Sequence, residues 1–374
     1  MSEDWTVHTL LRELEARGDH VAIAALTDAG RLTCGAAELA RDAAALAAAL
    51  RARGAAPGER ILLIGPGGID WVTLYLGIVA AGLVVVPLDD LSDADEIARI
   101  ASAEPPARAF ASPVHLDGVR AAAPEADIFV IPAPDEQDKT PDAPSWRTLL
   151  DGADKSLPGD ADLDAPAVLL QTSGTTGKPK LFTLSQRHIA SNVAALAAAD
   201  IAGTDDRLLM PLPMHHVYPQ VVGVLTALAV GARIVVPAAV TGPALMAALK
   251  EERCTGIIGV PRIYTAVVAG LEDALARKLK PLKWLYDGLM ALSVGMNRRL
   301  GINPGRLLFR WLRARLSSDL RLLVSGGAKL DEATTRKLVG LGLEFRCGYG
   351  LAETASTHTG NMPGATRLGT EGKP

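Results

Sequence analysis

The 374-residue sequence predicts an α/β protein built on mainly parallel sheet, and two observations carry this prediction. Apolar residues make up 49% of the chain and the mean hydropathy is +0.20, so the chain can bury a large core. Short apolar segments also alternate along the sequence with longer alanine-rich segments, as strands alternate with helices in a parallel sheet. At this length we expect two or more subdomains.

The first elements are predicted between residues 35 and 89. Residues 35–54 are rich in alanine, which favours a helix, and end at Gly54, a residue suited to the position after a helix. The 17-residue apolar stretch from Trp71 to Pro87 is marginal for a membrane span and is interpreted as a buried helix leading into a strand. We expect a strand and turn at 60–68, a helix at 70–82 and a strand at 83–89.

Further elements follow the same alternation. Residues 185–199 predict a helix. The polar, proline-rich segment 132–146 is interpreted as an exposed connection, so we expect one α/β subdomain at 1–145 and a second at 146–374. Short strands are expected at 107–112, 126–132, 207–213, 232–237, 255–261 and 320–327.

Composition also bears on the setting of the protein. Cys34, Cys254 and Cys347 lie far apart and form no metal-binding spacing, which favours a reduced, cytoplasmic location. The first twenty residues are polar and acidic, unlike a secretion signal.

Positive charge is concentrated in residues 277–321. This segment contains eleven Lys and Arg residues and two acidic residues. It therefore carries a net charge of +9, and the rest of the chain carries −13. Residues 306–316 place Leu308, Trp311, Leu312 and Leu316 near helical spacing, with arginines between them. Two interpretations stay open: a basic amphipathic helix that meets a membrane or an anionic ligand, or an ordinary surface helix with its apolar stripe turned inward. No nucleic-acid-binding motif accompanies the charge.

The stretch QTSGTTGKPK, from Gln171 to Lys180, has the composition of a phosphate-binding loop between a strand and a helix. Its hydroxyls, glycines and lysines suit an anion. The spacing excludes a Walker A loop and a dinucleotide-binding turn. A polar surface loop is the alternative interpretation.

Four ordered motifs resemble those of the adenylate-forming superfamily, which includes acyl-CoA synthetases. They are TSGTTGKPK at 172–180, LPMHHVYP at 212–219, VSGGAKL at 324–330 and GYGLAETA at 348–355. The resemblance extends from near residue 10 to the end of the chain. It implies two doubly wound, mainly parallel subdomains flanked by helices, with an incomplete small β subdomain at the C-terminal end.

The resemblance also implies the chemistry and the site. ATP and Mg²⁺ would activate a carboxylic acid as an acyl adenylate, and CoA would accept the acyl group. Outside its motif Tyr349 would be interpreted as a core tyrosine and Glu353 as a surface acid. The resemblance instead makes Glu353 the magnesium ligand and, with His216, a catalytic residue, and puts His215, His216 and Tyr218 beside the carboxylate. It assigns the nucleotide to Thr172, Ser173, Gly174, Thr175, Thr176, Gly177, Lys178, Gly326, Gly327, Ala328, Gly348, Tyr349, Gly350 and Thr354.

This chain also departs from the family's pattern. Ala352 stands where the family has a threonine near the α-phosphate. In the family a ribose-binding aspartate, a hinge and a C-terminal lid domain with a catalytic lysine follow the position at which this sequence ends. We therefore expect these 374 residues alone not to complete adenylation.

The expected substrate rests on residues 268–319. Their length resembles the long-chain acyl-CoA synthetases, which implies a medium or long-chain fatty acid and permits peripheral membrane contact through 277–321. A ligase that loads an acyl-carrier protein, and a domain that binds nucleotide or acyl ligand without turnover, are the alternatives.

Overall fold

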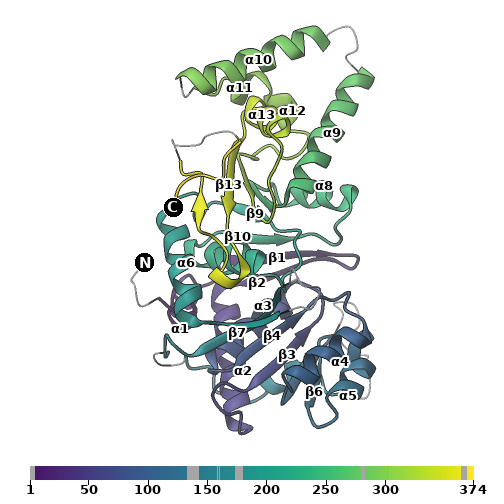
Figure 1. The fold of residues 1–374 in the computed structure, drawn as a ribbon, viewed down its shortest axis with the longest axis vertical. Helices are drawn as coiled ribbons and strands as arrows, with labels where there is room; N and C mark the ends of the chain where they lie inside the picture. The colour runs from purple at the N-terminus through teal and green to yellow at the C-terminus, as the bar shows by residue number, and fades with distance from the viewer. Residues whose placement is uncertain are drawn as a thin grey trace.

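The computed structural model describes residues 5–132, 143–157, 159, 161–172, 180–278, 283–300, 302–363 and 369–374, and it contains two sheets (Figure 1). The larger sheet has the order β14-β13-β12-β11-β9-β10-β1-β2. Its pairs are parallel except β1–β2 and β13–β14. The strands are β1 (Val21–Thr27), β2 (Gly30–Gly35), β9 (Arg207–Leu209), β10 (Arg233–Val236), β11 (Gly256–Gly259), β12 (Leu322–Ser325), β13 (Glu344–Tyr349) and β14 (Thr359–Gly360).

The smaller sheet has the order β6-β5-β3-β4-β7-β8, with one antiparallel pair, β7–β8. The sequence therefore predicted the fold class correctly: a mixed α/β chain with two parallel-rich sheets flanked by helices. The strands are β3 (Arg60–Ile64), β4 (Val84–Leu88), β5 (Arg108–Ala111), β6 (Asp127–Val130), β7 (Pro166–Thr172) and β8 (Lys180–Ser185).

The helices cover these sheets and join them (Figure 1). The largest cluster of buried side chains includes residues of α2, α3 and both sheets, so the two sheets share one core. The helices are α1 (Val7–Ala16), α2 (Ala36–Ala52), α3 (Ile69–Ala80), α4 (Ala94–Ala103), α5 (Leu116–Ala122), α6 (Gln186–Ala198), α7 (Ala227–Val230), α8 (Gly242–Glu251), α9 (Pro261–Lys278), α10 (Lys283–Leu300), α11 (Gly305–Leu308), α12 (Arg310–Arg313) and α13 (Glu332–Gly340); the short helices are η1 (Pro113–His115), η2 (Trp146–Leu150), η3 (Pro219–Thr226) and η5 (Ala352–Thr354).

Several predicted elements are confirmed. Gly54 follows α2 with a φ of +79°, the left-handed conformation that glycine adopts at low cost after a helix. The apolar stretch from Trp71 to Pro87 forms most of α3 and β4, and its residues are buried, apart from the partly exposed Gly82. Every helix among the described residues falls short of the length and apolar character that crossing a membrane requires.

The two sheets take strands from both sides of the predicted boundary at residues 145 and 146. The hairpin β1–β2 pairs with β10, whereas β7 pairs with β4. The division of the chain at residue 145 stays a prediction, and it does not coincide with the division between the sheets.

Two local predictions were wrong. The phosphate-loop candidate joins two antiparallel strands, β7 and β8, rather than a strand and a helix; α6 begins only after Ser185. The basic stretch at 306–316 is not one amphipathic helix, because α11 and α12 are short and break at Phe309. Leu312 and Leu316 are buried as the inward stripe requires, but Trp311 is exposed.

Candidate functional site

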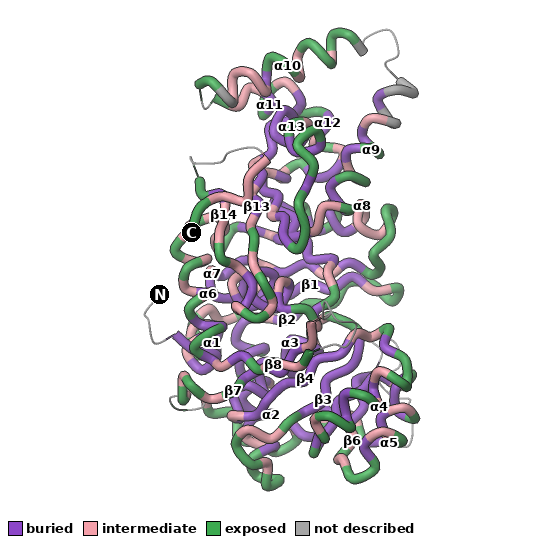
Figure 2. Tube along the Cα trace, in the orientation of Figure 1, coloured by how far each residue is buried: buried purple, intermediate pink, exposed green. Residues whose placement is uncertain are grey.

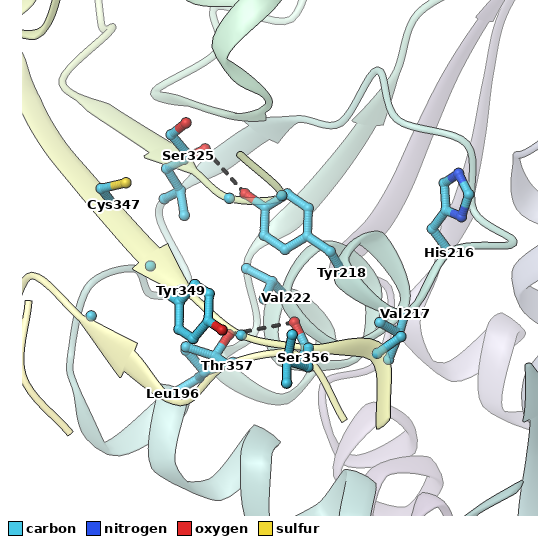
Figure 3. Close-up of a pocket in the computed structure, with 18 of the residues that line it drawn as sticks. Leu196, His216, Val217, Tyr218, Val222, Ser325, Cys347, Tyr349, Ser356 and Thr357 are labelled. Atoms are coloured by element: carbon cyan, nitrogen blue, oxygen red, sulfur yellow. Dashed lines mark hydrogen bonds between the residues drawn. The ribbon is translucent and has the colours of Figure 1, made fainter. Parts of the chain in front are cut away.

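A cleft of about 690 Å³ lies at the carboxyl ends of β12 and β13 (Figure 3). Ligands of open α/β sheets commonly bind beyond the carboxyl ends of parallel strands, and this volume is in the range of small-molecule sites. The walls come from the end of α6, the segment 216–222, the turn after β12 and the segment 346–362. Gln171, Thr172 and Lys180, at the adjoining ends of β7 and β8, border the same space.

The turn after β12 requires its glycines. Gly326 lies under the ring of Tyr218, where a Cβ would come 2.8 Å from Cε2 of that ring. Gly327 has a φ of +79°, which favours glycine over other residues. The VSGGAKL motif therefore encodes a tight turn against an aromatic wall.

Tyr218 forms that wall, and its hydroxyl is hydrogen-bonded to the backbone. The hydroxyl donates toward the carbonyl oxygens of Gly259 and Val324, both at 3.2 Å, and Figure 3 draws the second of these bonds. Burial raises the pKa of Tyr218, so the hydroxyl keeps its proton. These two hydrogen bonds connect the side chain to β11 and β12 and fix the ring as one surface of the pocket.

Two adjacent histidines lie near one edge of the cleft. Their ring centroids are 3.9 Å apart, and Nε2 of His215 lies 3.7 Å from Oδ2 of Asp89. Burial lowers the pKa of His215 to about 4, helped by His216 and opposed by Asp89. Burial also lowers the pKa of His216, although part of that residue remains exposed. Both imidazoles are therefore neutral at pH 7.

The segment 349–354 supplies an aromatic face and a carboxylate. The Tyr349 side chain is 53% exposed and borders the cleft beside Thr357 (Figure 3). Glu353 lies in η5 and is exposed; it is the one carboxylate among the described residues that line the cleft. The hydroxyl of Thr354 donates to the carbonyl oxygen of Leu351 at 3.1 Å. Thr354 thus caps its own turn.

The structure brings together most of the predicted site residues that it describes. Those that line the cleft are Thr172, His216, Tyr218, Gly326, Gly327, Gly348, Tyr349, Gly350 and Glu353. His215, Ala328 and Thr354 lie outside its lining, and Ser173, Gly174, Thr175, Thr176, Gly177 and Lys178 lie outside the described residues. The roles assigned to all of these residues stay predictions.

Sequence reasoning missed other residues of the site. Leu196 and Ile201 extend the apolar part of the lining, and Arg346 and Asn361 add polar groups to it. Asn192 lies just behind it, hydrogen-bonded to the segment that carries Glu353. No sequence pattern marked these residues, because their proximity arises only from packing between distant elements.

Comparison with known proteins agrees with this architecture. The chain is 29% identical over 321 residues to a feruloyl-CoA synthase of Amycolatopsis sp, covering 85% of this chain and 54% of that protein. It is 27% identical over 368 residues to the long-chain fatty-acid CoA ligase FadD15 of Mycobacterium tuberculosis, covering 92% and 59%. The crystal structure of the anthranilate CoA ligase AuaEII with anthranoyl-AMP has a TM-score of 0.77 at 18% identity, over 100% of this chain and 64% of that one.

The chain therefore spans somewhat more than half the length of these two relatives. Residues 10–374 match the family described as AMP-binding enzyme, which is nearly the whole sequence. This protein belongs to the AMP-binding enzyme family.

Proposed function

We propose that this chain forms the nucleotide- and acid-binding part of an acyl-CoA synthetase. The observation that carries the proposal is a single cleft bordered by the ends of β7 and β8, the aromatic face of Tyr349, the turn at Gly326 and the carboxylate of Glu353. In the proposed reaction a carboxylate oxygen bonds to the α-phosphorus of ATP, and the bond to pyrophosphate breaks. A thiol of CoA then bonds to the acyl carbon, loses its proton and displaces AMP.

The proposed nucleotide pocket lies between Tyr349 and the turn after β12. An exposed tyrosine face suits a purine, and the backbone around Gly327 offers polar groups at close approach. The proposal gives the phosphates to Ser173, Thr175, Thr176 and Lys178, which connect β7 with β8 in sequence. Thr172 and Lys180 border the cleft at the two ends of that connection, which supports this assignment.

Glu353 is the proposed ligand of Mg²⁺. The donor chemistry fits, because magnesium prefers oxygen and is commonly held by one or two carboxylates together with substrate phosphates. The described lining of the cleft contains one carboxylate, that of Glu353, which is consistent with this preference. When bound, the ion would neutralise phosphate charge as pyrophosphate leaves.

His216 is proposed to contact the carboxylate of the acid. A neutral imidazole can donate one hydrogen bond without placing a fixed charge beside the phosphates. His215 is proposed to pack against it and to keep its ring in place, consistent with the 3.9 Å between their centroids.

The acyl group is proposed to be a medium or long-chain fatty acid. Leu196, Val217 and Val222 give part of the cleft an apolar wall, which suits a hydrocarbon chain. FadD15 is named a long-chain fatty-acid ligase, whereas other similar proteins are named for feruloyl and anthranilate chemistry. An aromatic acid is therefore the second candidate, and an acyl-carrier protein is the alternative acceptor.

Peripheral contact with a membrane is proposed through α10 and the residues that follow it. The exposed apolar side chains in this segment are Trp284, Leu285, Leu292, Leu300, Ile302, Leu307 and Trp311. They lie at one end of the molecule, where α10 has an exposed outer side (Figure 2). With the excess of Lys and Arg in 277–321, they have the composition of a surface that meets anionic lipid.

The test is acid-dependent exchange of labelled pyrophosphate into ATP, measured on the protein as its gene encodes it. Octanoate, palmitate, ferulate and anthranilate form the panel, and His216→Ala is the matched variant. We expect exchange with the fatty acids and its loss in the variant. Exchange with the aromatic acids alone would overturn the fatty-acid assignment, and ATP binding without exchange for any acid would favour a binding role. Product assays with CoA and with a carrier protein identify the acceptor.

A further inference from the structure

Asn192 connects α6 to the segment that carries Glu353. Its side-chain NH₂ donates to the carbonyl oxygens of Thr354 at 3.3 Å and Thr357 at 3.1 Å, and its side-chain oxygen accepts from the Thr357 N–H at 3.0 Å. These bonds join residues more than 160 positions apart in sequence. One amide thus holds both ends of the turn that follows Glu353.

That turn has an unfavourable backbone conformation. Ala355 and Ser356 have φ values of 57° and 102°, in the region that glycine adopts far more readily than alanine or serine. Residues in this conformation are strained and persist only when surrounding contacts hold them. Gly350 packs closely on the same turn, since a Cβ there would overlap the carbonyl of Ser356. The hydrogen bonds of Asn192 supply part of the restraint that the turn needs.

The position of Glu353 depends on this turn. In the part of the chain that the structure describes, no hydrogen bond or ion pair restrains the Glu353 carboxylate itself. Its place in the cleft is therefore set by the backbone of η5 and by what anchors that backbone. Hydrogen bonds within residues 351–356 hold this backbone locally, and Asn192 anchors it to α6 by donating to the carbonyl oxygen of Thr354, the residue after Glu353.

Asn192 lies in α6, and α6 directly follows β8, the strand after the proposed phosphate loop. β8 closes at Ser185, and the Ser185 hydroxyl caps the N-terminus of α6 by accepting from the N–H of His188. A rigid helix thus joins β8, next to the phosphate side of the cleft, to the carboxylate side. Asn192 is the residue through which that connection reaches Glu353.

We propose that Asn192 is a positioning residue that holds the Glu353 carboxylate where the metal–nucleotide complex needs it. The inference rests on the proposed function, because it concerns the same cleft. A purely structural role for Asn192 is the alternative: it would stabilise the turn without affecting how Mg²⁺ and ATP bind together.

The first test needs no ligand. Hydrogen exchange of the Thr357 amide is measured in the 374-residue chain and in Asn192→Ala, Asn192→Asp and Ser191→Ala. Ser191 is exposed on the same helix, and its hydroxyl donates to the carbonyl oxygen of His188 within that helix, so its variant is the control. We expect faster exchange in N192A and near-normal exchange in N192D, which keeps the acceptor for this amide. Unchanged exchange in N192A would mean that Asn192 does not hold the turn.

The second test separates positioning from simple stabilisation. ATP affinity is measured by calorimetry with and without Mg²⁺ in the wild-type chain, N192A, Glu353→Gln and the double variant. We expect N192A to lose about tenfold in affinity with Mg²⁺, little without it, and almost nothing further in the Glu353→Gln background. Equal losses with and without Mg²⁺, or additive losses in the double variant, would overturn the positioning role. If N192A does not fold, Asn192→Ser, which is also too short to reach both carbonyls, carries the same cycle.

The two proposals fail in distinguishable ways. A wild-type chain that binds no ATP under either condition overturns the proposed function and this inference together. A wild-type chain that binds ATP with a Mg²⁺ requirement, combined with an additive cycle, leaves the proposed function standing and removes only the role of Asn192.

Discussion

The ring of Tyr218 lies so close to Gly326 that a Cβ at residue 326 would come 2.8 Å from Cε2 and 2.9 Å from Cζ of the ring. The ring cannot move aside cheaply, because its hydroxyl is bonded to the carbonyls of Gly259 and Val324. We predict that Gly326→Ala lowers the free energy of unfolding by about 1–3 kcal/mol, as overpacking of an interior does. Guanidinium unfolding measures this change.

Gly203→Ala is the control for that substitution, since a Cβ at residue 203 would have, apart from its chain neighbours, no heavy atom of the described residues within 4 Å. Tyr218→Leu, alone and combined with Gly326→Ala, completes a double-mutant cycle that measures the coupling free energy between the ring and the turn. A double variant that loses the sum of the two single effects would show that the ring and the turn are independent.

Lowering the pH should destabilise the protein through His215. Its folded pKa of about 4 lies below the ordinary value near 6.5, so between these values the unfolded chain binds a proton that the folded chain does not. Stability contributed by the neutral ring is complete above pH 6.5 and is lost as the pH falls towards 4. His215→Gln should reduce this slope by up to about 1.4 kcal/mol per pH unit. Urea unfolding from pH 4 to 7.5 measures it.

Substitution of the exposed His358 provides the reference for this pH series. A His358→Gln variant with the same reduction in slope would show that the effect does not come from the packed pair of histidines.

Replacing Tyr349 should affect nucleotide binding without affecting folding. The side chain is 53% exposed, so Tyr349→Ala is expected to change the free energy of unfolding by no more than about 0.5 kcal/mol. Loss of the aromatic face should weaken ATP binding by about tenfold, whereas Tyr349→Phe should retain most of it. Calorimetric titration compares the two. Val240→Ala, at a similarly exposed apolar position outside the cleft, is the control.

The exposed face of α10 should mediate binding to anionic lipid vesicles. Trp284 and Leu292 are 72% and 53% exposed, so Trp284→Ser with Leu292→Ser should reduce co-sedimentation with phosphatidylserine-containing vesicles at little cost in stability. Arg310→Glu should do the same by reversing a charge. Leu91→Ser, at a side chain 89% exposed, is the matched control. Undiminished co-sedimentation in all three α10-region substitutions would exclude this surface.

Arg313 is unsuitable for that experiment, although it lies in the same short helix as Arg310. Its guanidinium donates to the carbonyl oxygens of Gly342 and Arg306, and burial lowers its pKa. Charge reversal at Arg313 would therefore disturb the packing of α11 and α12 as well as any lipid contact.

The sequence predicted most local elements, because apolar and alanine-rich segments follow helix and strand periodicity. The pairing of β1 with β10 could not be predicted in this way, since it joins residues about two hundred positions apart through backbone groups that every residue carries. β8 was missed for a different reason. All but one of its residues are exposed or partly exposed, and the strand runs directly into the capping serine of α6, so strand and helix merge in the sequence pattern.

The motifs also predicted which segments meet in the cleft, but not what each side chain does there. The motif put Tyr218 beside the substrate but did not predict that its hydroxyl donates to the carbonyls of Gly259 and Val324. The hydroxyl of Thr354 is likewise bonded within its own turn. Hydrogen-bond partners of this kind depend on tertiary packing, which a motif does not specify.

The N-terminal hairpin β1–β2 belongs to the larger sheet, whose other strands come much later in the chain, and this sets the order in which the strands can pair during synthesis. Every described strand of the smaller sheet has left the ribosome once Ser185 emerges, so these strands can pair while residues from Arg207 onward are still being made. The hairpin formed by Val21–Thr27 and Gly30–Gly35 must wait for Arg233–Val236 before its inner edge is paired. Until then the nascent chain carries an unpaired strand edge, the feature through which newly made sheet proteins associate wrongly and on which chaperones act.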